Sequence, residues 1–567
     1  RIVRAAKRVR SILEGRLTMR RITLTSLALA LGVVLALASL TLAQQAPPTW
    51  KQGQPRELAD SPLAPIAQPP APKAPGEIPI EKIKVPPGFK VSLWAHGINN
   101  ARAMTWGDKG TLFVSSRVAG NVYAVVDKGA AREVKTIAKG LNLPNGVAFK
   151  DGTLYIAEVS RITKMEGIED RLDNPPDMKV VYDVLPRDLP HGWKYLAFGP
   201  DGKLYFNIGA PCNICMPPDT HANISRVNPD GTGFEYYAHG VRNSVGFDWH
   251  PVTKELYFTT HGRDWLGEDV PSDRFDHAPR KGLHFGYPYC HQGDIPDPEY
   301  GKGRACSEFA PPLIKTGPHV AGNGVHFYTG SMFPAEYKNR AFLAQRGSWN
   351  RTQKIGFRVM MVTLRTADVP KYEAFAEGWL QGDQITGIAP LQAADLEAGR
   401  RKAAPCAACH GPDGNATLPG MPSLAGQPVF FTHWQLIKFR DGRRKDPGMS
   451  PFAANLSDAD MADLAAYYAT LPPRGRPQAV DATKAAAGQR LAAANYCTSC
   501  HRPDLSGQQQ VPRLAGQDLE YLLRLLRAYK AQTAADLDGT MTMAVQPLSE
   551  ADIENLAHYI AGLAPTP

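Results

Sequence analysis

The chain has 567 residues, 43% of them hydrophobic, and a formal net charge of +10. This length predicts more than one domain, and the apolar content is sufficient for globular cores. Most of the excess charge lies in residues 1–43; the remaining residues include 56 basic and 53 acidic side chains. Such a small excess of basic over acidic side chains argues against a nucleic-acid-binding protein.

Residues 1–43 have the features of a secretory signal. A basic segment that starts at Met19 precedes the apolar run 27–43, which ends in small residues and predicts cleavage after Ala43. Residues 1–18 lie upstream of this start. An uncleaved membrane anchor is the alternative, because the run is nearly long enough to span a bilayer. Cleavage would leave no stable membrane span and would place the protein in the periplasm, where disulfides persist.

Residues 44–80 are rich in Pro and Ala without a periodic pattern, so we expect an extended linker. Residues 81–392 repeat a pair of apolar strands around a turn that often contains Asp-Gly, which predicts antiparallel meanders. Repeats of roughly 40–60 residues are typical of propeller blades. The clearest copies are AMTWGDKGTLFVSS (103–116), NGVAFKDGTLYIAE (145–158), YLAFGPDGKLYFNIG (195–209), VGFDWHPVTKELYFTT (245–260) and GVHFYTG…RAFLAQRGSW (324–349).

The repeat count predicts a six-bladed all-β propeller. Five blades are clear, and a sixth, cut short before the helical region, begins at YEAFAEGWL (372–380). A propeller closes to remove its sheet edges, and the segment KVSLWA (90–95) or the N-terminal linker could complete the last blade. A β-sandwich is the alternative, which the number of repeats disfavours.

Four cysteines lie in the propeller region. In an exported chain an even number predicts disulfides, and proximity pairs Cys212 with Cys215 and Cys290 with Cys306. A zinc site built from the four is the alternative, although no spaced pair of histidines accompanies them.

The propeller region also contains five distinctive segments: LPHGWKYLAFGPDGKLYFNIGAPCNIC (189–215), HGVRNSVGFDWHP (239–251), THGRDWLGEDVPSDRF (260–275), GLHFGYPYC (282–290) and AQRGSWNRTQKIGFRV (344–359). In this order and spacing they resemble the soluble sugar dehydrogenases that depend on pyrroloquinoline quinone (PQQ), most closely the sorbosone dehydrogenase-like branch. The resemblance covers about residues 85–392.

The resemblance implies a catalytic base and a cation at the propeller mouth. His191 matches the base that takes the hydroxyl proton while hydride leaves the substrate carbon. Arg242, with Asn243 beside it, matches the family's HGxRN position, where a guanidinium stabilises negative charge on the quinone. A solvent-exposed loop histidine and a surface arginine are the alternatives. Further cations for the carboxylates of PQQ are expected among three residues of the last blade, which would otherwise form a solvated face: Arg351, Lys354 and Arg358.

The family also holds a Ca²⁺ that bridges protein and cofactor. Backbone oxygens of Gly262 and Arg263 match its place. The following loop is acidic, so a second, structural ion is a further hypothesis, with hydrated side chains as the alternative. The carboxylates concerned are Asp264, Glu268, Asp269 and Asp273.

Residues 393–567 are richer in Ala, and helical spacing replaces strand alternation. Two units, 393–472 and 481–567, align with each other and are joined by a hinge rich in Pro and Arg. CAACH matches CTSCH, PSLAGQ matches PRLAGQ, and each last helix is predicted to open with a capping box at Ser457 or Ser549. We therefore predict two small all-α domains. Their last helices bring apolar side chains to one face at helical spacing: Met461, Leu464, Ala465 and Tyr468 in the first, Ile553, Leu556, Ala557 and Ile560 in the second.

The pentapeptide C-x-x-C-H lets two thiols bond to one haem and places the adjacent His as an axial ligand to iron. Two copies predict two covalent haem c groups, held by Cys406, Cys409 and His410 and by Cys497, Cys500 and His501. The sixth ligands are expected to be Met449 and Met541, since each stands seven residues before the Leu that precedes a capping box. Methionine ligation favours electron transfer over catalysis.

Both units resemble class I cytochrome c domains. In that family the proline after the haem helix, here Pro422 or Pro512, orients the axial histidine through its carbonyl.

Together these features predict a periplasmic quinohaemoprotein. A sugar, aldehyde or alcohol would be oxidised through PQQ, and electrons would pass singly through two haems to an external acceptor, such as a soluble cytochrome or a terminal oxidase. Tethered one-electron carriers suit a two-electron cofactor. Two other classes stay open: a Ca²⁺-dependent propeller lactonase, and a docking propeller that carries a two-haem relay. Haem reduction that depends on PQQ would distinguish the predicted quinohaemoprotein from both of these alternatives.

Overall fold

The computed structural model describes residues 75–566, apart from residues 99, 118, 130, 189, 265, 365–368, 383, 386–393, 441, 443, 496, 509 and 535–539. The predicted signal, its cleavage site after Ala43 and most of the linker lie outside the described residues. Within them, no helix combines the length and the apolar character that crossing a bilayer requires.

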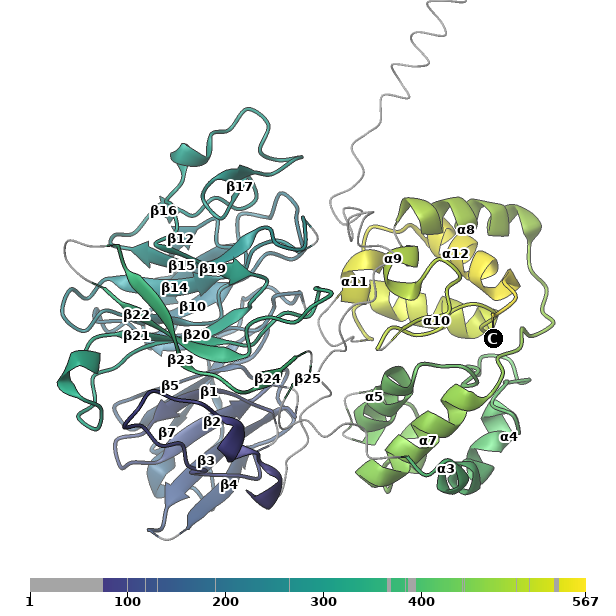
Figure 1. Cartoon of the computed structure of the whole chain (residues 1–567), viewed down its shortest axis with the longest axis horizontal. Helices are drawn as coiled ribbons and strands as arrows, with labels where there is room; N and C mark the ends of the chain where they lie inside the picture. Colours follow the sequence, from purple (N-terminus) through teal and green to yellow (C-terminus); the bar gives the residue numbers. More distant parts are fainter. Residues whose placement is uncertain are drawn as a thin grey trace, which may run out of the picture. The chain divides into compact units, whose positions relative to one another are not determined.

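Five antiparallel sheets follow one another along the chain, from purple to teal in Figure 1. Each contains the hairpin that its sequence repeat predicts, and one gains a fifth, parallel strand. The strands are β1 (Ala101–Trp106), β2 (Leu112–Ser116), β3 (Asn121–Asp127) and β4 (Arg132–Ala138); β5 (Gly146–Lys150), β6 (Thr153–Ala157), β7 (Ile162–Glu166) and β8 (Lys179–Tyr182); β9 (Leu196–Phe198), β10 (Leu204–Ile208), β11 (Asn223–Val227), β12 (Glu235–His239) and the added β16 (Leu283–His284); β13 (Phe247–Trp249), β14 (Leu256–Thr260), β15 (Ser272–Ala278) and β19 (Ile314–Pro318); β20 (Gly322–Phe327), β21 (Ala341–Gln345), β22 (Arg358–Thr363) and β23 (Lys371–Ala376).

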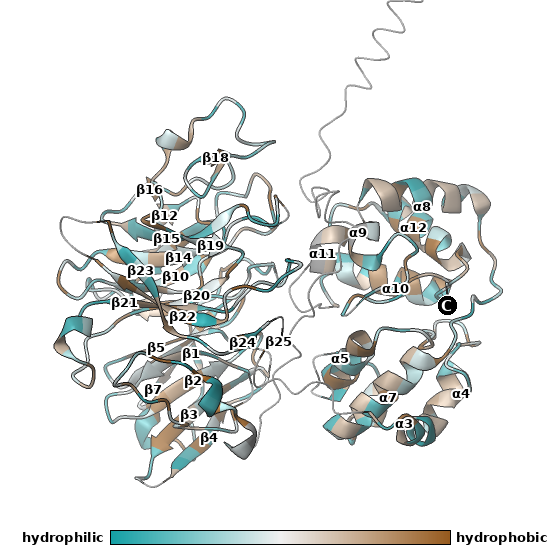
Figure 2. Ribbon diagram, in the orientation of Figure 1, coloured by the Kyte–Doolittle hydropathy of each residue, from teal (hydrophilic) through white to brown (hydrophobic). Residues whose placement is uncertain are grey.

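Local chemistry explains the hairpins. In the β5–β6 hairpin, Asp151 and Gly152 have φ of 49° and 72°, the conformation that a tight type I′ turn requires. Apolar residues, brown in Figure 2, occur along the strands. Their buried side chains pack between neighbouring sheets. Phe113 of β2 and Leu154 of β6 share one such core, and Tyr257 of β14 and Leu343 of β21 share another. The core therefore lies between successive blades.

The prediction of a sixth four-stranded blade is wrong for the described residues. The segment 372–380, read as the start of that blade, supplies β23 and pairs with β22 as the outer strand of the fifth sheet. Beyond it lies only the short hairpin of β24 (Leu380–Gln381) and β25 (Gln384–Ile385). The sequence misled because the fifth repeat is long, so its outer strands resembled a new unit.

The N-terminal segment does reach the last blade, but through other residues than predicted. Residues 90–95 form no strand. Instead, Lys84 forms an antiparallel bridge with Glu377, with N–O distances of 2.7 and 3.0 Å. Phe89 then packs its ring edge-on against Phe333 and Phe375, with centroids 4.8 and 5.1 Å apart. This contact covers part of the outer face of the fifth sheet.

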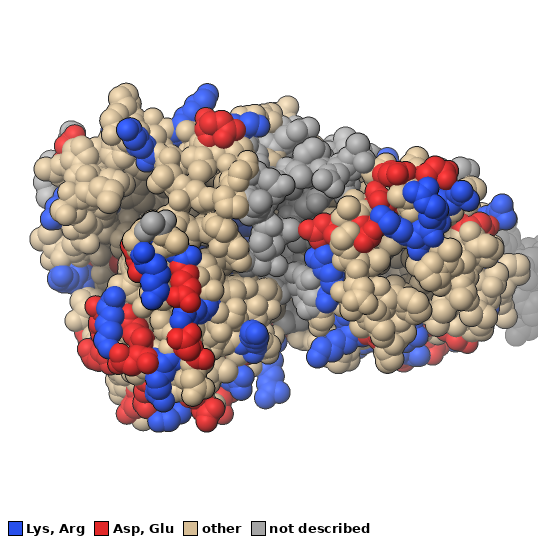
Figure 3. All heavy atoms as spheres, turned by 90° about the horizontal axis from the view of Figure 1, so that it is seen from below, with Lys and Arg blue, Asp and Glu red and all other residues tan. Residues whose placement is uncertain are grey.

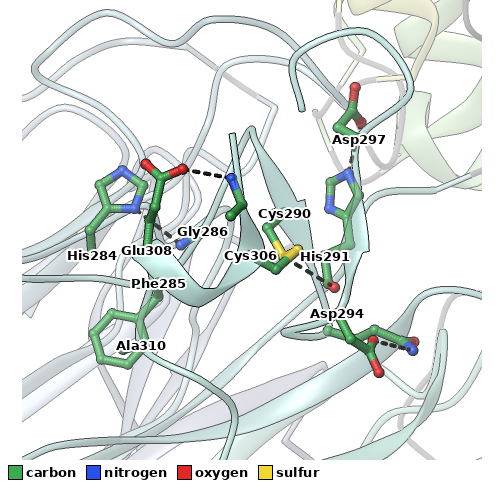
Figure 4. The surroundings of a disulfide bond; sticks show 12 residues. His284, Phe285, Gly286, Cys290, His291, Asp294, Asp297, Cys306, Glu308 and Ala310 are labelled. Carbon is green, nitrogen blue, oxygen red and sulfur yellow. Dashed lines mark hydrogen bonds and ion pairs between the residues drawn. A yellow bond between two sulfur atoms is a disulfide. The ribbon is translucent and has the colours of Figure 1, made fainter. Parts of the chain in front are cut away.

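Both predicted disulfides are present, Cys212–Cys215 and Cys290–Cys306, so the zinc alternative is excluded. The second closes the excursion that carries β17 (Cys290–His291) and β18 (Ile295–Pro296) (Figure 4). Beside it, the Asp297 carboxylate accepts hydrogen bonds from Arg263 and His291, both at 2.7 Å. All three of these side chains are at most 3% exposed.

The C-terminal region forms two helical domains, green to yellow in Figure 1. Both predicted capping boxes are present, at Ser457 with Asp460 and at Ser549 with Asp552, and the predicted apolar positions are buried. Gly399 and Gly488 occupy matched places, because a Cβ at either would lie within 2.3 Å of a carbonyl oxygen of the last helix. The helices are α3 (Leu396–Lys402), α4 (Ala407–His410), α5 (Val429–Arg440), α6 (Met449–Ala453) and α7 (Asp458–Thr470), then α8 (Ala482–Ala494), α9 (Cys497–His501), α10 (Leu519–Lys530), α11 (Thr540–Val545) and α12 (Glu550–Gly562).

The duplicated motifs PSLAGQ and PRLAGQ bond to each other reciprocally. The Ser423 amide donates to Gln517 Oε1 at 2.9 Å, and the Arg513 amide donates to Gln427 Oε1 at 3.0 Å. In return, Gln517 Nε2 donates to the Ser423 carbonyl at 2.7 Å, and Gln427 Nε2 donates to the Arg513 carbonyl at 3.0 Å. All four residues are buried. Equivalent residues of the two units thus exchange equivalent hydrogen bonds.

Candidate functional sites

The residues of the first candidate site lie at one edge of the propeller sheets. They come just before the first strand of a blade or just after the second: His191 before β9, Arg242 before β13, His261 after β14 and Arg346 after β21. In an antiparallel hairpin these two places meet at the same edge, which explains why residues far apart in sequence line one cavity. The predicted residues His191, Arg242, Asn243 and Gly262 all belong to this wall.

His191 is held in an unusual backbone conformation. Its φ of 49° is left-handed, which non-glycine residues adopt only where the surroundings impose it. The Nδ1–H donates to the Ala210 carbonyl at 2.8 Å, an assignment that leaves Nε2 as an acceptor. A Cβ at Gly209 would lie 2.5 Å from the His191 Cβ, so only glycine fits there. Burial, and then the Arg242 charge, lower the pKa of His191 well below its ordinary value. The ring is therefore neutral at neutral pH and suited to accept a proton.

Arg242 as a residue is only 3% exposed. Four hydrogen bonds fix its guanidinium. Nε donates to the Asn213 carbonyl at 2.7 Å and Nη1 to the Gly262 carbonyl at 2.7 Å. Nη2 donates to Asn213 Oδ1 and to Asp264 Oδ2, both at 2.8 Å. A guanidinium has five N–H groups, so one N–H of Nη1 is left without an acceptor in the described part of the chain.

Two buried asparagine side chains at this wall each have an oxygen atom without a hydrogen-bond donor among the described residues. Asn243 donates to His261 Nδ1 at 3.1 Å, and Asn350 donates to Asp264 Oδ1 at 2.9 Å. Their own Oδ1 atoms are buried and have no hydrogen-bond partner among the described residues. Unpaired buried acceptors cost free energy, which a ligand with donor groups would recover. This observation fits a polar ligand in the cavity.

The cations at the wall differ from those predicted. Arg351 pairs with Asp269, Arg358 pairs with Glu377, Lys354 is buried, and none of the three is among the residues that line the cavity. Three other arginines line it, with two tryptophans: Arg102, Arg117, Arg346, Trp193 and Trp349.

These arginines and rings suit a planar anion. The Arg117 guanidinium stacks 4.2 Å from the centre of the Trp193 ring. Burial and the nearby Arg346 charge lower the pKa of Arg102 to about 10, so this pair of like charges favours an anionic ligand. Arginines and flat aromatic rings are the partners that a planar cofactor with three carboxylates needs. The wall therefore fits PQQ.

One of the two predicted calcium ligands, the Gly262 backbone oxygen, already accepts a hydrogen bond from a cation. The Gly262 oxygen accepts from the Arg242 guanidinium, so a Ca²⁺ at that atom would face a fixed positive charge. The Arg263 side chain is buried against Asp297. The carboxylates of the acidic loop are bonded within the protein: Asp264 to Arg242, Glu268 to Thr352, Asp269 to Arg351, and Asp273 to the amides of Gly262 and Ala321. The loop is thus a network of internal bonds.

The second and third candidate sites lie in the helical domains. His410 donates from Nδ1 to the Pro422 carbonyl, and His501 donates from Nδ1 to the Pro512 carbonyl, both at 2.8 Å. This tautomer leaves Nε2 free of a proton, as a metal ligand requires. Burial lowers the pKa of His501 to about 4. Each histidine is among the residues that line a cavity, together with both cysteines of its pentapeptide and with Met449 or Met541. The four cysteines are not disulfide-bonded. These residues fit two haem c groups.

Charge does not gather by sign on the face shown in Figure 3, where Lys and Arg alternate with Asp and Glu. This mixture agrees with the near balance of charge outside residues 1–43.

Three regions match known families. Residues 150–348 match Glucose / Sorbosone dehydrogenase, residues 394–467 match Cytochrome C oxidase, cbb3-type, subunit III, and residues 485–564 match Cytochrome c.

Among similar proteins, an uncharacterised protein of Borreliella burgdorferi is 33% identical over 317 residues, which are 53% of this chain and 82% of its own. Cytochrome c4 of Azotobacter vinelandii is 36% identical over 32% of this chain and 93% of its own length. A solved structure, the PQQ domain of pyranose dehydrogenase from Coprinopsis cinerea, is 15% identical with a TM-score of 0.46 and covers 54% of this chain and 88% of its own. The chain belongs to the glucose/sorbosone dehydrogenase family in its propeller and to the cytochrome c family in its C-terminal helical domains.

Proposed function

We propose that this protein is a periplasmic quinohaemoprotein dehydrogenase. It oxidises a sugar, aldehyde or alcohol through PQQ and passes the electrons through two c-type haems to an external acceptor protein. The observation that carries this proposal is the pairing, in one chain, of a neutral, half-buried histidine beside a fixed guanidinium with two haem-attachment sequences. The family match of the propeller supports the same class of reaction.

His191 acts as the base. Its Nε2 accepts the proton of the substrate hydroxyl, while the Nδ1–H bond to Ala210 holds the ring in that tautomer. PQQ, when bound, accepts the hydride that leaves the substrate carbon. Because burial and the Arg242 charge lower the pKa of His191, the ring stays unprotonated at pH values below neutrality. A general base of this kind contributes roughly 10²–10⁴-fold to a rate.

Arg242 supplies fixed positive charge. Its four internal hydrogen bonds orient the guanidinium before any ligand arrives, so little reorganisation is needed when negative charge develops in the cavity. Arg102, Arg117 and Arg346 would bind the carboxylates of the cofactor, and Asn243 Oδ1 would accept a donor from cofactor or substrate.

The haem domains accept the electrons one at a time. Each would hold iron between a histidine and a methionine, which fills the coordination sphere and suits electron transfer. Two such sites can take both electrons of one turnover. A hydrolase would have no use for them, which is why we do not propose the lactonase.

The test uses the full chain with its haems. PQQ is added with and without Ca²⁺, a panel of aldoses, aldehydes and alcohols follows, and the visible absorption bands of reduced haem are recorded. Reduction that requires both PQQ and a substrate supports the proposal. Replacement of His191 by Gln should then slow reduction by roughly 10²-fold or more, whereas His326→Gln, at an exposed side chain, should not. Reduction without PQQ, or none with any substrate, would refute it.

A further inference from the structure

We propose that the loop 210–215, closed by the Cys212–Cys215 disulfide, is the element that positions both His191 and Arg242. This inference rests on the proposed function and adds to it a residue with a specific task, Asn213. Asn213 touches neither the substrate nor the reacting atoms in our proposal. It acts through Arg242 and is therefore a positioning residue.

The first end of the loop holds the base. Ala210 accepts the Nδ1–H of His191 at 2.8 Å, and its own amide donates to the Arg242 carbonyl at 2.7 Å. One residue thus touches the side chain of His191 and the backbone of Arg242. The neighbouring Gly209 allows the close approach, because any Cβ there would collide with His191.

The middle of the loop holds the cation. Asn213 offers Arg242 two acceptors, its carbonyl to Nε at 2.7 Å and its Oδ1 to Nη2 at 2.8 Å. The same side chain bonds to Asp264 twice: Oδ1 accepts the Asp264 amide at 2.7 Å, and Nδ2 donates to the Asp264 carbonyl at 3.0 Å. The Asp264 carboxylate in turn accepts a hydrogen bond from Arg242 Nη2 at 2.8 Å. Asn213 therefore fixes the plane of the guanidinium and its counter-ion together.

The disulfide and one buried tyrosine anchor the loop. The Tyr287 hydroxyl lies 3.2 Å from the Cys212 sulfur and accepts the amide of Cys215 at 3.1 Å. Ile214, between the cysteines, is fully buried with Ala210 and Tyr287. The two residues between the cysteines thus have opposite tasks, since Ile214 enters the core while Asn213 bonds to Arg242. The cross-link restricts the conformations of Asn213, so less conformational entropy is lost when its side chain is fixed against Arg242.

Two pairs of variants of the full holoprotein test this assignment. Cys212→Ser with Cys215→Ser removes the cross-link, and Cys290→Ser with Cys306→Ser removes the other disulfide of the same domain as the matched control. Asn213→Ala removes the side-chain acceptor, and Asn213→Asp restores an acceptor for Nη2. Three quantities are measured: PQQ affinity by equilibrium dialysis, kcat and KM from haem reduction, and the pH midpoint of His191 carbethoxylation, read by mass spectrometry of its peptide.

We expect Asn213→Ala and the Cys212/Cys215 double variant to lower kcat about 10²-fold, the cost of a small misplacement, with less change in KM. The His191 midpoint should rise, because the Arg242 charge is no longer held beside the ring, but it should stay below the ordinary value of about 6.5, because burial, the larger cause, remains. PQQ affinity should fall at least tenfold. Asn213→Asp should recover only part of kcat, because its carboxylate accepts from Nη2 but cannot replace the Nδ2 donor to the Asp264 carbonyl. The control pair should leave the His191 midpoint and the PQQ affinity unchanged.

Two results would overturn the assignment. One is a wild-type His191 midpoint in the Cys212/Cys215 double variant and in Asn213→Ala. The other is the same shift in both double variants, which would show a general loss of stability. If the wild-type protein neither binds PQQ nor oxidises any substrate, the proposed function fails, while the His191 midpoint, measured without PQQ, still decides whether the loop positions the ring.

Discussion

Replacement of Asp297 by Asn should destabilise the propeller strongly. The carboxylate is completely buried and accepts four hydrogen bonds, from Arg263 and His291 at 2.7 Å and from the amides of Glu299 and Tyr300 at 2.9 Å. An Asn side chain leaves the Arg263 charge buried and unpaired. Loss of one partner of a buried ion pair costs about 3–5 kcal/mol.

The chain offers a matched control three residues away. Asp294 pairs with Lys315, but this carboxylate is 58% exposed, so Asp294→Asn should cost at most about 1 kcal/mol. The assay is urea unfolding of the holoprotein, followed by tryptophan fluorescence for the propeller and by haem absorbance for the helical domains. Only the fluorescence midpoint should shift in Asp297→Asn.

A second variant separates charge from shape. Adding Arg263→Met to Asp297→Asn removes the unpaired cation, so the double variant should be more stable than Asp297→Asn alone. Hydrogen bonds, chiefly from His291, outweigh burial and lower the pKa of Asp297, so its stabilisation is fully present above about pH 5 and is lost progressively as pH falls below that. Equal losses in Asp297→Asn and Asp294→Asn, or a double variant less stable than the single one, would refute this reasoning.

Three further predictions concern other parts of the chain. Burial lowers the pKa of Lys194 from 10.5 to about 7, so the native state binds fewer protons than the unfolded chain between these values. The free energy of unfolding should therefore rise by about 2–3 kcal/mol from pH 7 to 9 in urea titrations, and Lys194→Met should abolish that rise. Met541→His should lower the midpoint potential of one haem in a spectroscopic redox titration, because imidazole replaces a thioether ligand; two unchanged potentials would show that Met541 is not the ligand. Gly209→Ala should reduce kcat/KM about 10²-fold by displacing His191, while Gly76→Ala, in open space, should have no effect on haem-reduction kinetics.

Local patterns predicted the elements well. Asp-Gly turns and strand alternation located five hairpins, and Ser-x-x-Asp located two helix starts, because such signals depend on residues that are neighbours in the chain. The error at 372–380 concerned strand pairing, since an outer strand such as β23 has no local mark that tells it from the first strand of a new blade.

The cavity wall was harder to predict. Its cations were sought among Arg351, Lys354 and Arg358, whereas Arg102 and Arg346, more than 240 residues apart in sequence, lie close enough for their charges to interact. A usable signal existed: an arginine placed directly after the second strand of a hairpin, as Arg117 and Arg346 are, stands at the same edge as His191. Internal bonds such as that of Gly262 with Arg242 have no sequence signal, so the sequence did not predict that the Gly262 oxygen accepts from a guanidinium.

The reciprocal bonds of Gln427 with Arg513 and of Gln517 with Ser423 have an evolutionary consequence. Because the two copies meet through the same surface, as the halves of a symmetric dimer do, the contact is saturated by two members and cannot recruit a third. A gene duplication that fused such halves would stop at a pair, and adding a third domain of this type would require a different kind of contact.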